Sequence, residues 1–188
     1  MKRKITSIVL SLALCLSVLP APVWAATEEA ANYYDPTNQS TTSQLCTVVD
    51  ETTGTWETGW YVAKGEVTLQ SVTVDGSVNL ILADGCELTV SDGIVIGENN
   101  SLTVWEQTAN YGSNGKLTVK RVSKSDDHGA AAIGGVHDHT YDQKTVMFVP
   151  PTKAGAFTVN GGRIKATGGQ TTWSAGQAYA PYNNDYMV

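Results

Sequence analysis

The residues best suited to metal chemistry lie close together in this chain. All three histidines fall within 12 residues, and three aspartates accompany them: Asp126, Asp127, His128, His137, Asp138 and His139. Imidazole and carboxylate groups are ligands of zinc and related ions, and two residues at i and i+2 share one face of an extended strand. However, the spacing matches no established zinc pattern, and loops rich in His and Asp are often only solvated. Metal binding by His128, His137 and His139 is therefore one hypothesis, and a solvated loop is the other.

Aromatic side chains offer a second chemistry, which is stacking on sugar rings. Carbohydrate sites combine aromatic faces with a few polar groups that orient hydroxyls. Trp105 follows Val104 directly, so the strand alternation that buries Val104 turns the Trp105 ring outward. We predict Trp105, Tyr111 and Trp173 as sugar-stacking residues. The alternative is that Trp105 covers a corner or packs under a loop.

Carboxylates at Asp75, Asp84 and Asp92 raise the question of polysaccharide cleavage. Lyases and hydrolases built on β-helices place two or three carboxylates in one external groove. Each of these aspartates precedes a glycine, which turn chemistry already explains. The chain has no Ser/His/Asp order or nucleophile elbow, and its corners lack the strict Gly-Asp period of calcium-binding repeats. An enzyme is therefore the rival hypothesis, and no cofactor is expected.

The first 25 residues have the pattern of an export signal. Lys2-Arg3-Lys4 precedes an apolar run from Ile5 to Leu19, and Val23-Trp24-Ala25 offers small residues at −3 and −1 of a cleavage site. The apolar run is short for a membrane span. Cleavage after Ala25 predicts a secreted or cell-surface protein with no membrane segment left. Cys15 suggests a lipoprotein signal as a minor alternative, although the preceding Leu14 is large for that motif.

The net charge of the chain argues against two classes of partner, and its cysteines raise the question of a disulfide. The chain has 12 basic and 18 acidic residues; without the three basic residues of the signal the balance is 9 against 18, or −9. Such a charge repels nucleic acid phosphates and anionic lipid surfaces, so neither is expected as a partner. Cys46 and Cys86 remain in a compartment that permits disulfides. They either pair with each other or stay as separate thiols, because their spacing does not decide the matter.

A repeated three-residue pattern predicts the β-strands that position these residues. Large apolar–Thr–Val occurs five times, the first four copies 16, 14 and 15 residues apart: Val72-Thr73-Val74, Leu88-Thr89-Val90, Leu102-Thr103-Val104, Leu117-Thr118-Val119 and Phe157-Thr158-Val159. In a strand, residues i and i+2 share a face. Each copy is therefore expected to bury its apolar ends and turn its Thr toward solvent. Irregular spacing argues against an ice-binding Thr ladder.

Two-residue turn signals separate these strands and define the fold class. They are Asp75-Gly76, Asp84-Gly85, Asp92-Gly93, Asn99-Asn100 and Asn114-Gly115. The short spacing, the similar triplets and the lack of a long helix-period segment favour an all-β right-handed parallel β-helix, or solenoid. An antiparallel β-sandwich is the alternative, since the same dipeptides make tight hairpins.

The domain plan follows from this pattern. Residues 26–55 are rich in Thr and Ser and predict a flexible arm, to which Leu45, Val48 and Val49 add at most one strand. Residues 56–169 form the solenoid, with an insertion loop around 121–151 in which Ala130–Ile133 is a tightly packed rung. Residues 170–188 either cap the last coil or begin a truncated tail.

Several runs within the solenoid resemble a known family. They include Gly59-Trp60-Tyr61-Val62, Leu80-Ile81-Leu82-Ala83-Asp84-Gly85 and Val159-Asn160-Gly161-Gly162. They are similar to the secreted β-helix-like repeat regions of large Gram-positive bacterial cell-surface proteins, which are described as carbohydrate-binding-like. The resemblance covers about residues 56–169 and implies contact with wall or environmental polysaccharide, without catalytic residues. We expect an exported structural or adhesive module with weak polysaccharide binding; the alternative is a truncated or degenerate β-helix carbohydrate-active enzyme.

Overall fold

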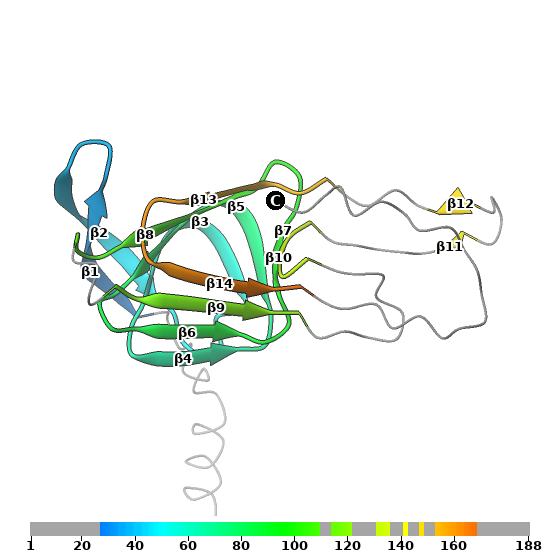
Figure 1. The fold of residues 1–188 in the computed structure, drawn as a ribbon, viewed down its shortest axis with the longest axis horizontal. Helices are drawn as coiled ribbons and strands as arrows, with labels where there is room; N and C mark the ends of the chain where they lie inside the picture. Colours follow the sequence, from blue (N-terminus) through cyan, green and yellow to red (C-terminus); the bar gives the residue numbers. More distant parts are fainter. Residues whose placement is uncertain are drawn as a thin grey trace, which may run out of the picture.

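The fold of the chain is all-β, as the sequence predicts. A computed structural model describes residues 27–109, 114–121, 131–135, 141–142, 147–148 and 153–168, and these contain strands and no helix (Figure 1). The strands are, in chain order, β1 (Glu28–Asp35), β2 (Ser40–Val48), β3 (Thr55–Ala63), β4 (Glu66–Leu69), β5 (Val72–Leu82), β6 (Glu87–Val90), β7 (Ile94–Ile96), β8 (Ser101–Glu106), β9 (Lys116–Lys120), β10 (Ile133–Gly134), β11 (Tyr141–Asp142), β12 (Met147–Phe148), β13 (Ala156–Val159) and β14 (Arg163–Thr167).

Most neighbouring strands run parallel, in three ladders. One ladder joins β4, β6, β9 and β14, and these strands lie one above another in Figure 1. A second joins β3, the second half of β5, β8 and β13. The third joins the start of β3 (Thr55–Glu57), the first half of β5, β7 and β10. Among the described strands only β1–β2 and β11–β12 pair antiparallel, so the alternative of an antiparallel sandwich does not fit these ladders.

The apolar–Thr–Val triplets build the core in the way the sequence predicts. In the first four copies the apolar ends are buried, with exposed fractions of 0–1%, while the Thr side chains are exposed or half-buried. The fifth copy pairs with the third in register, Phe157 with Leu102 and Val159 with Val104. Its apolar ends are nevertheless exposed, at 38% and 46%. The reason is that β13 has β8 on one side and no other described strand on the opposite side.

The corner dipeptides act through two different physical effects. Gly85 and Gly93 adopt φ of 72° and 83°, and Asn99 adopts 68°, as expected for residues tolerant of positive φ. Gly115 is required by close packing instead, because a Cβ there would lie 2.5 Å from the Ala83 carbonyl oxygen. Asp75-Gly76 lies inside β5, where Gly76 adopts φ of 102°, and it separates the half of β5 that pairs with β7 from the half that pairs with β8.

The N-terminal segment corrects the prediction of a flexible arm at residues 26–55. β1 and β2 form an antiparallel hairpin, and β2 continues into a parallel pair with β3 at Thr47 and Val48. An ion pair between Lys64 and Glu29 joins the hairpin to the chain just after β3. The segment looks disordered by composition because the hairpin buries few apolar side chains; in β1 only Ala31 is fully enclosed.

The hairpin covers the outer side of the second ladder. Leu80 and Ile81 are consecutive in β5 and face opposite sides of the sheet, yet both have 0% exposure. A strand buried on both faces carries a continuous apolar run, and here β1 contacts β5 and β8 from outside. The Leu80-Ile81-Leu82 run is therefore apolar without interruption because β1 covers the outer face of this part of β5.

The predicted rung in the insertion is present where the structure describes it. Ala132 is buried, and β10 pairs in parallel with β7, Ile133 beside Ile94. β11 and β12 pair with each other in antiparallel fashion. The rest of residues 121–151, apart from Arg121 and 131–135, and all of the predicted cap at 170–188 lie outside the described residues.

Candidate functional site

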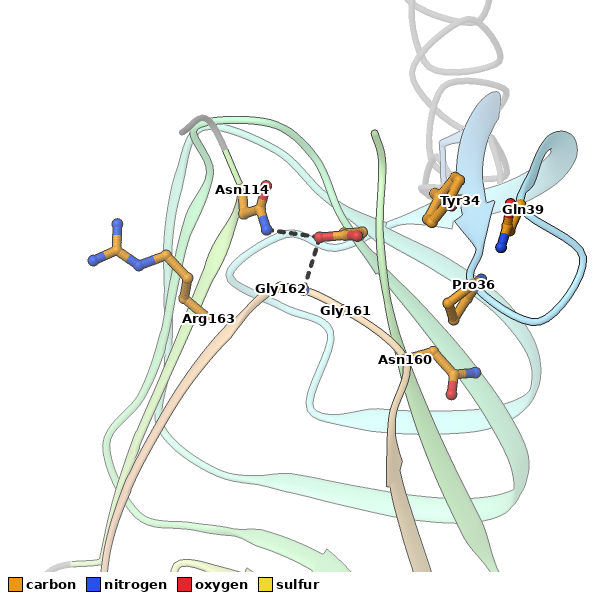
Figure 2. Close-up of a pocket in the computed structure, with 9 residues that line it drawn as sticks. Tyr34, Pro36, Gln39, Asn114, Asn160, Gly161, Gly162 and Arg163 are labelled. Carbon is orange, nitrogen blue, oxygen red and sulfur yellow. Dashed lines mark hydrogen bonds between the residues drawn. The ribbon is translucent and has the colours of Figure 1, made fainter. Parts of the chain in front are cut away.

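A polar cleft opens between the hairpin and one end of the ladders. Its volume is about 520 Å³. We call it the hairpin cleft; Figure 2 shows its walls. The turn between β1 and β2 forms one wall, and the ends of β8, β9 and β14 with the corner before β14 form the other. The lining residues are Tyr34, Pro36, Gln39, Glu106, Asn114, Asn160, Gly161, Gly162 and Arg163.

Glu106 is the buried carboxylate at the base of this cleft. It continues the inward alternation of Leu102 and Val104 along β8, and its exposed fraction is 7%. A charged group with so little access to water needs hydrogen-bond donors. Its Oε2 accepts a hydrogen bond from Asn114 Nδ2 at 2.6 Å and a long one from the Gly162 backbone N–H at 3.5 Å (Figure 2). No hydrogen bond to Oε1 is seen within the described ranges.

The glycine pair before β14 is needed for this arrangement. A Cβ on Gly161 would lie 2.5 Å from Glu106 Cγ and 2.7 Å from Cδ. Gly162 has φ of 85°, which side chains other than glycine rarely adopt, and a Cβ there would meet Leu82 at 2.8 Å. The Asn160-Gly161-Gly162 corner therefore carries Asn160 beside the cleft while leaving space for the carboxylate.

The turn of the hairpin holds the opposite wall in place. Asp35 Oδ1 accepts from the Thr37 backbone N–H at 2.8 Å, and Oδ2 accepts from Asn38 Nδ2 at 2.6 Å. These hydrogen bonds, the Thr37 bond foremost, lower the pKa of Asp35 below its ordinary value. The ionised carboxylate fixes the turn that presents Tyr34 and Gln39 to the cleft (Figure 2).

Trp105 lies outside the cleft, in an aromatic cluster with Tyr33 and Trp60. Its ring points away from the core, as alternation predicts, and is half-buried. The ring centroids of Tyr33 and Trp60 lie 4.9 Å and 6.0 Å from it, and its Nε1 donates to Asn79 Oδ1 at 3.0 Å. The Trp105 ring therefore packs under the hairpin, in agreement with the alternative that it packs under a loop. Tyr111 and Trp173 lie outside the described residues.

Other candidate residues have structural partners or fall beyond the described ranges. Asp84 accepts from the Thr108 hydroxyl at 2.7 Å, and Asp92 Oδ1 lies 3.8 Å from Arg121 Nε. His128, His137 and His139 belong to the ranges the structure leaves undescribed. Within the described ranges, no three His, Cys, Asp or Glu side chains gather closely enough to hold a metal.

Cys46 and Cys86 are both free and buried, so the structure has the two separate thiols and not the disulfide. Burial raises the pKa of each thiol. Low exposure and a raised pKa both reduce the amount of reactive thiolate. The two side chains therefore act as small core residues, each in contact with the hydrophobic core.

No protein family model, curated protein or solved structure matches the chain. The hairpin cleft must therefore be interpreted by its chemistry. It combines one aromatic ring and a proline, three side-chain amides (Gln39, Asn114 and Asn160) and a buried carboxylate. This combination suits a polyhydroxylated ring, because the apolar groups cover C–H surfaces while the amides and carboxylate bind hydroxyls.

Sequence reasoning missed the residues of this cleft. Glu106 carries a visible signal, since it occupies the inward position two residues after Val104, where an apolar side chain is expected. Tyr34 and Gln39 carry none, because their position depends on a hairpin that the composition hides.

Proposed function

We propose that this chain is an exported structural or adhesive module that binds polysaccharide in the hairpin cleft. The observation that carries the proposal is the convergence of Tyr34, three amides and the Glu106 carboxylate in one open cleft. An open site lined by hydrogen-bonding groups suits weak binding to an extended polymer, whereas deep apolar pockets suit small ligands.

The proposed scaffold is a right-handed parallel β-helix. Its support is the order in which the chain visits the ladders: first half of β3, second half of β3, then β4; first half of β5, second half of β5, then β6; β7, β8, β9; β10, β13, β14. Each group of three contributes one strand to each ladder, as one coil of a solenoid does. Right-handed crossovers between parallel strands are the strong general preference, and the same hand follows from the family resemblance.

Binding without turnover is the form of activity that the cleft favours. Glycoside hydrolases use two carboxylates on either side of the scissile bond. Glu106 is the one acidic side chain among the described lining residues, and two of its possible contacts are already occupied by donors. A degenerate β-helix enzyme remains the second candidate, and product release from a bound polymer tests it directly.

The proposed function requires a location outside the cell. The signal pattern of residues 1–25 supports secretion or surface exposure, where wall and environmental polysaccharides are found. In the part of the chain that the structure describes, no helix is long and apolar enough to cross a membrane.

A glycan array probed with the purified protein tests the proposal. We expect binding to at least one polysaccharide, with loss of most of that binding in Tyr34→Ala. Leu45→Ala is the matched control, since Leu45 lies on the same hairpin, is 62% exposed and does not line the cleft. Failure to bind any glycan, or equal losses in both variants, would reject the proposal. Release of reducing or unsaturated ends from a bound polymer would favour the enzyme.

A further inference from the structure

A group of basic side chains covers the outer face of β9 and β14. We call it the cationic strip, and it consists of Lys116, Lys120, Arg163 and Lys165. These are four of the nine basic residues that follow residue 25, and the two strands contain no acidic residue. The rest of the chain is acidic, with a formal net charge of −6 for the whole sequence. The local charge is thus opposite to that of the molecule.

Strand register puts all four side chains on one face. Arg163 lies beside Lys116, Lys165 beside Thr118, and Thr167 beside Lys120. The residues between them, Leu117 and Val119, are fully buried, so the basic positions alternate outward. Figure 1 shows β9 and β14 side by side in the ladder that also contains β4 and β6.

Little within the described chain neutralises the strip. Lys116 has one acidic neighbour, Glu87, whose carboxylate oxygen lies 3.7 Å from Nζ. No side-chain partner of Lys120, Arg163 or Lys165 is found within the described ranges. Like charges on adjacent strands repel one another and destabilise the sheet. An arrangement with that cost is most readily explained by a ligand that carries negative charge.

The strip is continuous with the hairpin cleft. Arg163 belongs to both, because it lines the cleft while its guanidinium extends away from Tyr34 and Asn160 (Figure 2). Asn114 lies two residues before Lys116 on the same side of the structure. A polymer bound in the cleft would therefore meet the basic side chains as it leaves the cleft.

We propose that the ligand is an acidic polysaccharide: sugar rings occupy the hairpin cleft, and carboxylate groups of the same polymer bind the cationic strip. The inference rests on the proposed function of the cleft. Guanidinium and ammonium groups form charge-assisted hydrogen bonds to carboxylates. A polyol phosphate lacks the ring faces that Tyr34 and Pro36 suit.

A second copy of the chain is the competing occupant. The outward row Glu66, Glu87, Lys116, Arg163 runs from acidic to basic across four strands, so two copies related by a two-fold axis would bring opposite charges together. Four strands of about five residues offer roughly 300 Å² per copy, well below the roughly 800 Å² per partner of stable interfaces. The polymer is therefore the favoured occupant.

Calorimetric titration with two forms of one polymer tests the inference. Polygalacturonate carries free carboxylates, and fully methyl-esterified polygalacturonate has the same backbone without charge. We expect tighter binding to the charged polymer, and a loss of this preference in high salt, where surface charges are screened. Lys120→Gln and Lys165→Gln, at exposed strip positions that do not line the cleft, should each weaken binding of polygalacturonate by about fivefold and leave binding of the esterified polymer unchanged.

Lys153→Gln is the matched control, since it removes the same charge from an exposed lysine, 82% accessible, that is paired with Glu98. Equal weakening by Lys153→Gln would mean a general charge effect and would overturn the strip. Unchanged binding of polygalacturonate by both strip variants, together with weaker binding of both polymers by Tyr34→Ala, would also overturn the strip. That result would still support the hairpin cleft as the binding site. If the protein binds neither polymer, the role of the strip is overturned. The glycan array then tests the hairpin cleft separately. Self-association in sedimentation that the strip variants abolish, without any charged-polymer preference, would assign the face to a second copy.

Discussion

Glu106 accepts a 2.6 Å hydrogen bond from Asn114 across the corner between β8 and β9. The two residues are eight positions apart, and the bond joins a buried carboxylate to the edge of the cleft. Because Gly162, in the turn between β13 and β14, donates to the same oxygen, this one side chain connects three segments of the site.

Glu106→Gln should lower the free energy of unfolding by about 1 kcal/mol, because a neutral amide replaces the charged acceptor of two hydrogen bonds. Chemical denaturation measures the difference. Glu66→Gln, on the exposed side of β4, serves as the control and should change stability by less than about 0.5 kcal/mol. An increase in stability for Glu106→Gln would mean that the buried charge is poorly compensated.

Gly161→Ala should cost about 1–3 kcal/mol, because the added Cβ overlaps the Glu106 side chain. Gly97→Ala is the control, since the nearest atom to its Cβ would be 3.6 Å away. In a double-mutant cycle, Gly161→Ala combined with Glu106→Ala should cost less than the sum of the single changes, because the overlaps with Glu106 Cγ and Cδ are removed and only the one with Cβ, at 2.8 Å, is left. Additive costs would contradict a direct contact between the two positions.

Acid should loosen the hairpin turn only at low pH. The pKa of Asp35 is lowered on folding from its ordinary value of 3.8, first by the Thr37 N–H. A group with a depressed folded pKa stabilises the fold above its ordinary pKa, and this contribution is lost as pH falls through the folded value. An NMR titration of the Asp35 carboxyl should give a midpoint below 3.8. A midpoint at or above that value would contradict the turn geometry.

Trp105→Ala should destabilise the protein without removing glycan binding. The substitution removes ring contacts with Tyr33 and Trp60 and leaves Asn79 without its indole donor, at a cost of roughly 2–4 kcal/mol. Binding, measured at a temperature where the variant is still folded, should stay near the wild-type level, in contrast to Tyr34→Ala. Loss of binding in a folded Trp105→Ala protein would return the stacking role to Trp105.

The triplets made the strands and their buried faces predictable. Leu102-Thr103-Val104 fixes which side chains enter the core by alternation alone, and the described structure has them there. The same rule gave the outward direction of Trp105. Alternation could not predict that the Trp105 ring is covered. The covering residues belong to β1, which pairs and packs through residues distant in sequence.

The hairpin cleft could not be predicted from the sequence for the same reason. Residues 28–48 contain few apolar side chains and hold their structure through cross-strand hydrogen bonds and the Asp35 turn. Only the inward position of Glu106 signalled a polar site at this end. The partners of Glu106 come from separate turns, and their convergence depends on the parallel pairing of β13 with β8 and of β14 with β9.

Polysaccharide binding in the hairpin cleft is tested most directly by an amide chemical-shift map of the protein titrated with an oligosaccharide from the glycan array. We expect the largest shifts at Gly162, Asn114 and Gln39, around the hairpin cleft, and further shifts along β14 when the oligosaccharide carries carboxylates. Shifts centred on Asn79 and Trp105 instead, or none at saturating ligand, would contradict it.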